Sequence, residues 1–489
     1  MMNLVRNAFA SAQTKEKRDA VKADANRLAY HLMPPVGWLN DPNGLCEYNG
    51  VYHIFYQYTP GNPTGADHRG WGHYTTKDFI HYNEQDDPFV PDTEADGKGS
   101  YSGSAFIEDG KLHFFYTGNN KLPGDYDYIN NGRIHWVIHS ESLDGLTFTP
   151  KEVLLKNKDY PENLSCHVRD PKILKRNGQY YMVLGARTKD SHGQAEVFVS
   201  TDLKHWKYAS TIRPEHDFGY MWECPDLFEL DGKTILMTCP QGVAQEGILY
   251  ENIYQNGWFE VDGSLDHDQT VKNFKEFDNG FDFYAPQSFQ DEKGRRILIG
   301  WMGIPDADYT NPTVKANWQH ALTLPRQLHD QNGRLYQYPI DEILSLRQEK
   351  MDINLGGGEC IKLPSRVVDI DLKPVADTWA ITLRKDVTLS YKDGIFTLDP
   401  GTSGSGRTSR HVKVDTIDQL EIFSDTSSLE IFINHGQYAF TTRVYDDASD
   451  LKLCVSAPMT GQIFTMASFE VVEKIEKSDP TLPSIKKEC

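Results

Sequence analysis

Polar and aromatic residues, three of them carboxylates, recur at a regular distance before predicted turns, and the carboxylates suit acid–base chemistry. Each lies about eight to ten residues before the glycine of a predicted hairpin turn. Two carboxylates that face each other can cleave a glycosidic bond, because one protonates the leaving oxygen while the other attacks the sugar or activates water. A third carboxylate could bind sugar hydroxyls. In chain order the residues at this offset are Asp41, Ser102, Asp170, Glu223 and Tyr284.

The neighbours of Glu223 suit a general acid. Trp222 and Cys224 flank it, and an apolar environment raises the pKa of a carboxyl group because the charged form loses solvation. A raised pKa keeps the proton available near neutral pH. We therefore expect Glu223 to protonate a leaving group and later to activate water.

The two aspartates have polar neighbours. Asp41 follows Asn40 in a segment rich in turn residues, and hydrogen bonds there would favour the ionised form that a nucleophile requires. A plain loop is the alternative for Asp41, because Asp and Pro are common in turns. Asp170 follows Arg169. Asp170 either forms a structural salt bridge with Arg169 or is held ionised by it to bind sugar hydroxyls.

Predicted β-hairpins position these residues. A run of β-branched, aromatic and aliphatic residues follows each turn and predicts a buried strand. The turns recur roughly every 60 residues, which is close to the repeat of sheets arranged around a common axis. Equivalent positions on the inner strands of such a ring converge on the axis, so the carboxylates would face one another. The turn glycines are Gly50, Gly110, Gly178, Gly232 and Gly294.

The pattern predicts an all-β protein with two domains, because 489 residues are too many for one core. We expect a five-bladed β-propeller over 30–335 and a β-sandwich over 352–475, where short alternating strands are separated by turn residues. A segment over 1–29, rich in Ala, Lys, Glu and Arg, should be helical, with a frayed arm as the alternative. A linker helix over 336–351 and a loose tail over 476–489 complete the chain.

Charge and cysteine spacing narrow the classes of partner. A net charge of −20 without a basic stretch argues against nucleic acid and anionic membranes as partners. The seven cysteines show no CxxC pair or ligand-like spacing, so we expect no disulfide framework, no metal and no cofactor. No segment approaches membrane-spanning length, and the N-terminal segment is too charged for a signal peptide. These features predict a cytoplasmic protein.

Five short motifs resemble those of glycoside hydrolase family 32, which includes invertases, fructan hydrolases and sucrose-6-phosphate hydrolases. The resemblance implies the propeller and the sandwich, and hydrolysis of β-fructofuranosides with retention of configuration. It implies Asp41 as nucleophile, Glu223 as acid/base and Asp170 as transition-state stabiliser. The motifs are WLNDPNG at 38–44, YSGSA at 101–105, RDP at 169–171, ECPD at 223–226 and DFYAPQ at 282–287; SLEIFIN at 428–434 resembles the sandwich domain.

The resemblance also implies a fructose pocket. Trp71, Tyr284 and Trp301 could supply aromatic walls, with core packing as the alternative for each. The loop 64–70 lacks a Trp that many family members carry before the Trp-Gly-His motif, so the resemblance does not fix one pocket wall or the leaving-group preference. The pocket residues that the resemblance implies are Asn40, Gln57, Ser102, Arg169, Tyr284 and Trp301.

The expected substrates are sucrose 6-phosphate, sucrose and short fructo-oligosaccharides. A fructan hydrolase or a fructosyltransferase with the same nucleophile is one alternative, and a sugar-binding propeller without catalysis is another. That last alternative predicts a missing acid, yet all three carboxylates are present. His68 and Arg69 are candidates for contact with a phosphate, because a dianion needs positive groups in a chain of this charge. An exposed arginine in a loop is the alternative.

Two further segments, 76–82 and 200–207, share a pattern of a small polar residue, an aspartate, an apolar residue, a histidine and an aromatic residue. This pattern suits a corner between two strands. A catalytic role for His81 or His205 is the weaker alternative.

Overall fold

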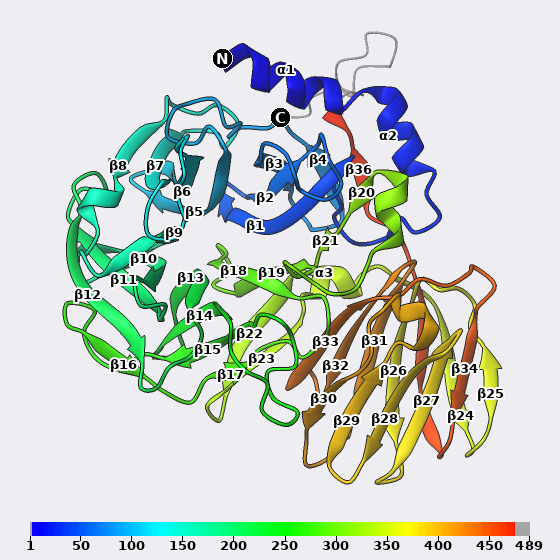
Figure 1. The fold of residues 1–489 in the computed structure, drawn as a ribbon. Helices are drawn as coiled ribbons and strands as arrows, with labels where there is room; N and C mark the ends of the chain where they lie inside the picture. Colours follow the sequence, from blue (N-terminus) through cyan, green and yellow to red (C-terminus); the bar gives the residue numbers. More distant parts are fainter. Residues whose placement is uncertain (1, 475–489) are drawn as a thin grey trace.

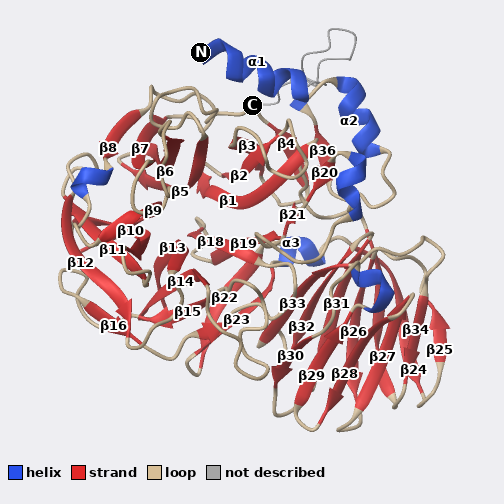
Figure 2. Ribbon diagram, in the orientation of Figure 1, coloured by secondary structure: helices blue, strands red, loops and turns tan. Residues whose placement is uncertain are grey.

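The computed structural model describes residues 2–474 and is built from strands, with short helices at the N-terminus and between sheets (Figures 1 and 2). The strands of the N-terminal part form five sheets, and those of the C-terminal part form two. The expected tail, 476–489, lies outside the described residues. Within the described range, no helix is long and apolar enough to cross a membrane.

The five N-terminal sheets are arranged in a ring (Figure 1). The first strand of each sheet contacts the first strand of the next, and β18 contacts β1, so the ring closes. These first strands are β1 (Gly37–Tyr48), β5 (Gly99–Glu108), β9 (Leu164–Arg176), β13 (Met221–Leu230) and β18 (Tyr284–Gln290).

The remaining strands of the ring follow outward in each sheet. The first sheet adds β2 (Val51–Thr59), β3 (Gly70–Thr76), β4 (His81–Glu84), β20 (Trp318–Gln319) and β36 (Glu470–Val472). The second adds β6 (Lys111–Lys121), β7 (Arg133–Ser142) and β8 (Glu152–Leu155). The third adds β10 (Gln179–Thr188), β11 (Gly193–Ser200), β12 (Lys207–Pro214) and β16 (Gln269–Val271). The fourth adds β14 (Lys233–Gln241), β15 (Gly257–Glu260) and β17 (Lys275–Glu276), and the fifth β19 (Arg296–Met302), β21 (Ala321–Leu322), β22 (Arg326–Gln331) and β23 (Arg334–Pro339).

The predicted hairpin turns are confirmed. In the first four sheets an Asn or Asp with positive φ precedes the glycine, as in Asn49 (φ 52°) and Gly50 (φ 70°). This geometry matches the twist of the flanking strands. The fifth turn has only Gly294 in the left-handed region (φ 82°). Because each turn joins a first strand to a second, it fixes the register of the strand that carries a site residue.

The corner pattern is confirmed as structural. Asp78 and Asp202 each accept backbone N–H groups two and three residues later, and a side-chain oxygen of each contacts the following histidine at 2.7 Å. The side chains of His81 and His205 are 59% and 87% exposed. The same corner occurs at Asp144. These histidines therefore lie at exposed corners between strands, as the corner pattern predicted.

The C-terminal part consists of two six-stranded sheets that bury one apolar cluster between them. One sheet contains β24 (Arg347–Leu355), β35 (Met459–Met466), β26 (Val368–Pro374), β31 (Leu420–Asp425), β32 (Ser428–Ile433) and β33 (Tyr438–Arg443). The other contains β25 (Cys360–Lys362), β34 (Lys452–Val455), β27 (Trp379–Arg384), β28 (Val387–Lys392), β29 (Ile395–Asp399) and β30 (Arg410–Lys413). This is the sandwich that the alternating strands predicted.

The helices are shorter than expected. The N-terminal segment forms α1 (Met2–Ala12) and α2 (Lys15–Lys22), and residues 23–36 are not helical. Arg18 of α2 is fully buried and pairs with Glu84 at 2.7 Å, so the segment is anchored rather than frayed. The linker helix is limited to α3 (Asp341–Leu344), because strand β24 already begins at Arg347. Three short 3₁₀ helices lie at Asn157–Asp159, Pro312–Ala316 and Gly401–Gly404.

The expectation of no disulfide is wrong. Cys360 and Cys454 lie directly opposite each other on β25 and β34 and form a disulfide. They are 94 residues apart, so their spacing in the sequence gave no signal.

Buried charges hold the ring against the sandwich. Arg326 of β22 is fully buried, and its guanidinium binds Glu430 of β32 at 2.5 Å and Asp278 at 2.9 Å. His31 bridges Asp425 and Glu430 at 2.7 and 2.9 Å. The two parts are therefore joined by fully desolvated ion pairs, whose partners cannot be removed singly without leaving a buried charge.

Candidate active site

All five first strands depart from regular pairing at the predicted site residues. A bulge places an extra residue on one strand, bends it and changes the direction of its side chains, and such bulges are common beside active sites. The shifts fall between Leu39 and Pro42, Ser100 and Gly103, Arg169 and Lys172, Glu223 and Asp226, and Tyr284 and Gln287.

Asp41 lies within a network of hydrogen bonds. Ser102 donates to its Oδ2 at 2.5 Å and Asn40 donates to its Oδ1 at 3.0 Å. Gln57 connects the two donors, because its amide nitrogen donates to Ser102 at 2.9 Å and its oxygen accepts from Asn40. The thiol of Cys224 lies 3.5 Å from Asp41 Oδ2. Three of the expected pocket residues are therefore brought together around the expected nucleophile.

The pKa of Asp41 is raised, although the sequence suggested that its hydrogen bonds would favour the ionised form. Burial raises its pKa, and the nearby Glu223 carboxylate adds to this effect. The hydrogen bonds from Ser102 and Asn40 act in the opposite direction, as the sequence predicted, but they are outweighed. A sugar that brings further donors would favour the ionised form.

Glu223 is not in the apolar environment that its neighbours suggested. Arg169 donates to its Oε1 at 2.6 Å, and its Oε2 accepts hydrogen bonds from Tyr284 at 2.7 Å and Gln241 at 2.8 Å. Trp222 is fully buried in an apolar cluster. Successive side chains of a strand point to opposite faces, so Trp222 does not contribute to the environment of Glu223.

Asp170 lies between these groups in a left-handed conformation with φ 65°. The backbone N–H of Cys224 donates to its Oδ2 at 2.9 Å. Burial raises the pKa of Asp170 to about 7, against the effect of the Arg169 guanidinium. That guanidinium lies 3.9 Å from Asp170 but 2.6 Å from Glu223. Arg169 therefore favours the ionised form of Asp170 from a distance, while its direct hydrogen bonds go to Glu223.

The three candidate aromatic walls have different surroundings. Tyr284 contacts Glu223, and the rings of Tyr284 and Trp301 lie 6.2 Å apart. Trp71 is fully buried among Phe55, Phe89 and other core rings, so it follows the packing alternative. Its indole N–H donates to the backbone oxygen of Tyr101 at 3.0 Å.

The two candidate phosphate contacts also differ. Arg69 reaches inward, with Nη1 3.5 Å from the Gln57 oxygen and Nη2 3.3 Å from the Gly65 carbonyl, and its charge lowers the pKa of Asp41. His68 contacts Asp67 at 2.9 Å and its side chain is 40% exposed. Arg69 alone of the pair lies near the nucleophile.

Sequence reasoning missed Gln241 and His167. Gln241 comes from β14 and had no signal, because its contact with Glu223 depends on pairing in the folded sheet. His167 accepts a hydrogen bond from Arg169 at 2.8 Å. Its position two residues before Arg169 on one strand could have indicated that both side chains share a face.

A cluster of one buried and two half-buried carboxylates, together with an arginine, a tyrosine and amide side chains, is typical of a glycosidase site. The chain belongs to the glycosyl hydrolases family 32. It matches the family's N-terminal domain over residues 31–339 and its C-terminal domain over residues 382–472.

Known proteins of this family resemble the chain over nearly its whole length. A sucrose-6-phosphate hydrolase of Bacillus subtilis is 38% identical over 473 residues, which cover 93% of this chain and 96% of the relative. One from Klebsiella pneumoniae is 38% identical and covers 86% and 89%. The solved sucrose-6-phosphate hydrolase of Lactobacillus gasseri is 30% identical with a TM-score of 0.85, covering 94% and 97%. A variant of the Bombyx mori GH32 beta-fructofuranosidase in complex with sucrose is 28% identical with a TM-score of 0.83, covering 96% and 99%.

Proposed function

We propose that this family 32 hydrolase cleaves the β-fructofuranosyl bond of sucrose 6-phosphate, sucrose or both, with retention of configuration. The observation that carries the proposal is the contact across the ring between Cys224 of β13, which directly follows Glu223 in the chain, and Asp41 of β1. The two carboxylates of a retaining pair must lie close together on either side of the bond. The names and substrates of the relatives support the choice of sugar.

In the first step, the Asp41 carboxylate attacks the anomeric carbon of the fructosyl group. Glu223 donates its proton to the glycosidic oxygen, so the glucosyl part leaves as a neutral alcohol. In the second step Glu223 takes a proton from water, and the resulting nucleophile displaces Asp41 from the anomeric carbon. We assign Asp170 to the binding of fructose hydroxyls, which it does better when ionised.

The surrounding residues hold this pair in place. Arg169, Tyr284 and Gln241 contact Glu223, and Asn40 and Ser102 contact Asp41. We therefore place these residues, with Gln57 and Trp301, around the fructosyl group, and we leave Trp71 in the core.

We further propose that the ring over 30–335 is a five-bladed β-propeller and that 352–475 is a separate β-sandwich domain, joined by the linker 336–351. The closed ring of contacts between the first strands of five sheets supports five blades. Action in the cytoplasm stays a prediction, which cell fractionation against a cytoplasmic marker tests.

For the phosphate we propose Arg69. Its guanidinium lies beside Gln57 and close enough to Asp41 to affect its pKa, so an anionic group on the leaving sugar could reach it. His68 is bound to Asp67 and exposed, and it is a weaker candidate.

The experiment is a comparison of products from sucrose and sucrose 6-phosphate. We expect release of glucose or glucose 6-phosphate, and NMR at early times should show the β anomer of fructose first. Early release of the α anomer would refute retention. Accumulation of oligosaccharides instead of free fructose would favour a fructosyltransferase, and hydrolysis of fructans but neither sucrose would favour a fructan hydrolase.

A further inference from the structure

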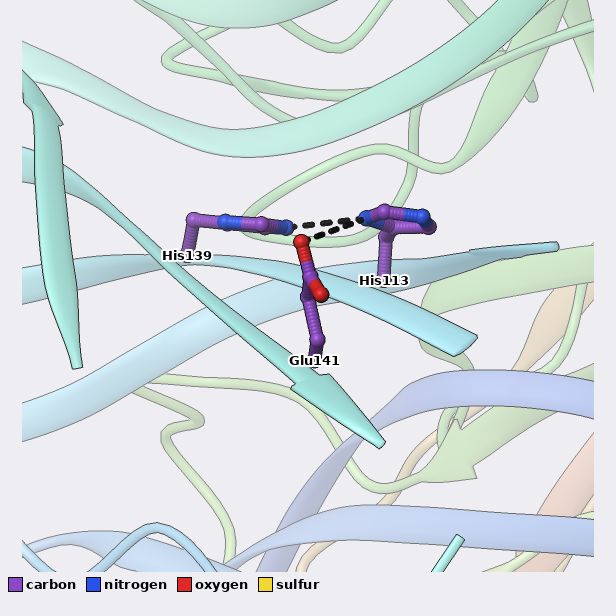
Figure 3. A group of neighbouring side chains, drawn as sticks. All are labelled: His113, His139 and Glu141. Carbon is purple, nitrogen blue, oxygen red and sulfur yellow. Dashed lines mark hydrogen bonds and ion pairs between the residues drawn. The ribbon is translucent and has the colours of Figure 1, made fainter. Parts of the chain in front are cut away.

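Two histidines and a glutamate lie close together in the second sheet, where β6 begins and β7 ends (Figure 3). His113 lies on β6, and His139 and Glu141 lie on the neighbouring strand β7. The imidazole rings point toward each other, with His113 Nδ1 3.1 Å from His139 Nε2, and the Glu141 carboxylate lies 3.8 Å from His113 Nδ1. None of these residues belongs to the candidate active site.

The separations match those of ligand atoms around a small metal ion. Zinc binds imidazole nitrogen and carboxylate oxygen at about 2.0–2.2 Å, so ligand atoms in a tetrahedral site lie about 3.3 Å apart. His113 is 7% exposed and His139 2%, which places the ligand atoms out of bulk water, while the Glu141 side chain is 19% exposed and remains reachable. Only a small movement of Glu141 is needed to close the site.

We propose that His113 Nδ1, His139 Nε2 and Glu141 bind a divalent transition metal ion, for which Zn²⁺ is the best match, with water as the fourth ligand. Two imidazoles and one carboxylate are a ligand set that zinc accepts. The ion would replace the hydrogen bond between the two histidines and join β6 to β7.

The groups around the cluster fit this assignment. Glu152 lies 4.0 Å from His139 Nδ1, the ring nitrogen that does not face the ion. This separation is too long for a hydrogen bond, but an exposed Glu152 side chain that moved closer would orient the metal-binding histidine and raise its basicity. Lys111 contacts the other oxygen of Glu141 at 3.2 Å, which leaves the oxygen near His113 available for the ion.

The first sheet contains a matched arrangement without the glutamate. His53 and His73 form the same stacked pair, with Nδ1 and Nε2 3.1 Å apart. The strand register is also the same, but the residue opposite His53 is Thr75, where the residue opposite His113 is Glu141. Both sheets therefore pack a stacked histidine pair, and of these two sheets the second places a carboxylate beside the pair as a third ligand.

The proposed ion lies too far from the carboxylate cluster to take part in the reaction. Thr117 of the same strand contacts the backbone of Asp170, and four residues of strand separate it from His113, which is about 13 Å. The inferred role is structural, and hydrolysis should continue in the presence of a chelator.

The test is zinc binding by protein first stripped with a chelator, measured by calorimetry and by metal analysis after dialysis. We expect one zinc per chain and a higher melting temperature with zinc. Glu141→Gln and Glu141→Thr should weaken binding at least tenfold, and Glu141→Thr copies the first sheet, where the chain already folds around threonine. Cobalt in the wild-type protein should give the strong visible absorption of a tetrahedral site, and this absorption should be lost in both variants.

The matched control is His205→Gln, which removes an exposed histidine that also pairs with a carboxylate. It should bind zinc as the wild type does. The proposal fails if the wild type shows no saturable binding, if the Glu141 variants bind with unchanged affinity, or if His205→Gln loses binding to the same extent.

Discussion

Removal of the Tyr284 hydroxyl should give a moderate loss of activity whose size follows from the contacts of Glu223. The hydroxyl donates to Glu223 Oε2 at 2.7 Å, and Gln241 donates to the same oxygen at 2.8 Å. A hydrogen bond to a charged group contributes about 1.5–3 kcal/mol, which corresponds to roughly 10–150-fold in rate. Because Gln241 remains in Tyr284→Phe, we expect the lower end, about tenfold in kcat/KM.

The assay compares sucrose with a fructoside that has a good leaving group. Tyr284 acts on the group that protonates the leaving oxygen, so its loss should matter more for sucrose than for the activated substrate. Tyr254→Phe is the matched control. Its ring lies 6.2 Å from that of Tyr284, but its hydroxyl contacts Asp306 at 2.8 Å instead of Glu223. We expect less than a twofold change in this control.

Three results would contradict the reasoning. A loss below twofold would mean that the hydrogen bond to Glu223 contributes nothing to the transition state. A loss above about a thousandfold exceeds what one hydrogen bond supplies and would give Tyr284 a different role. Equal losses for both substrates would separate Tyr284 from the proton transfer.

Four further changes have defined outcomes. Asp41→Asn should lower turnover by at least roughly three orders of magnitude, because no glycosyl-enzyme can form; near-normal rates in a folded variant would exclude Asp41 as nucleophile. Glu223→Gln should affect activated substrates less than sucrose, and azide should rescue its second step; equal losses without rescue would argue against the acid/base role. Arg69→Ala should raise KM for sucrose 6-phosphate about tenfold and leave that for sucrose unchanged, and a parallel change in both would remove Arg69 from the phosphate site. Burial raises the pKa of Glu196 from 4.5 to about 7, so the free energy of unfolding should fall as the pH rises between these values. In denaturant titrations, Glu196→Gln should remove up to roughly 3 kcal/mol of this fall. The same pH dependence in the variant and the wild type would contradict the prediction.

Local signals predicted most of the fold. Each hairpin turn was recognisable because a glycine and its neighbour must adopt positive φ, as Asn49 and Gly50 do. The offset from these turns then located the five residues that the first strands carry into one site. The family motifs contain the same residues, so the pattern and the resemblance agree.

The sequence did not predict the contacts between strands that are far apart in the chain. The environment of Glu223 comes from Arg169, Gln241 and Tyr284 on three other strands, and none of them is a neighbour in the chain. The disulfide joins positions 94 residues apart. The pKa of Asp170 depends on burial, which one sequence does not show. Each of these features depends on contacts between residues far apart in the chain, whereas a turn depends on residues that are neighbours in the chain.

The first sheet gains its outermost strand, β36, from residues 470–472, which pair in parallel with β4. It also gains β20, from residues 318–319, beside β1. During synthesis one edge of β4 therefore stays unpaired until β36 has been made. At about 5–20 residues per second this takes tens of seconds. An open strand edge can pair with other chains in that interval. The strand that carries Asp41 is made early, but the sheet that supports it is completed last, so truncation before residue 470 should cause aggregation rather than a smaller active enzyme.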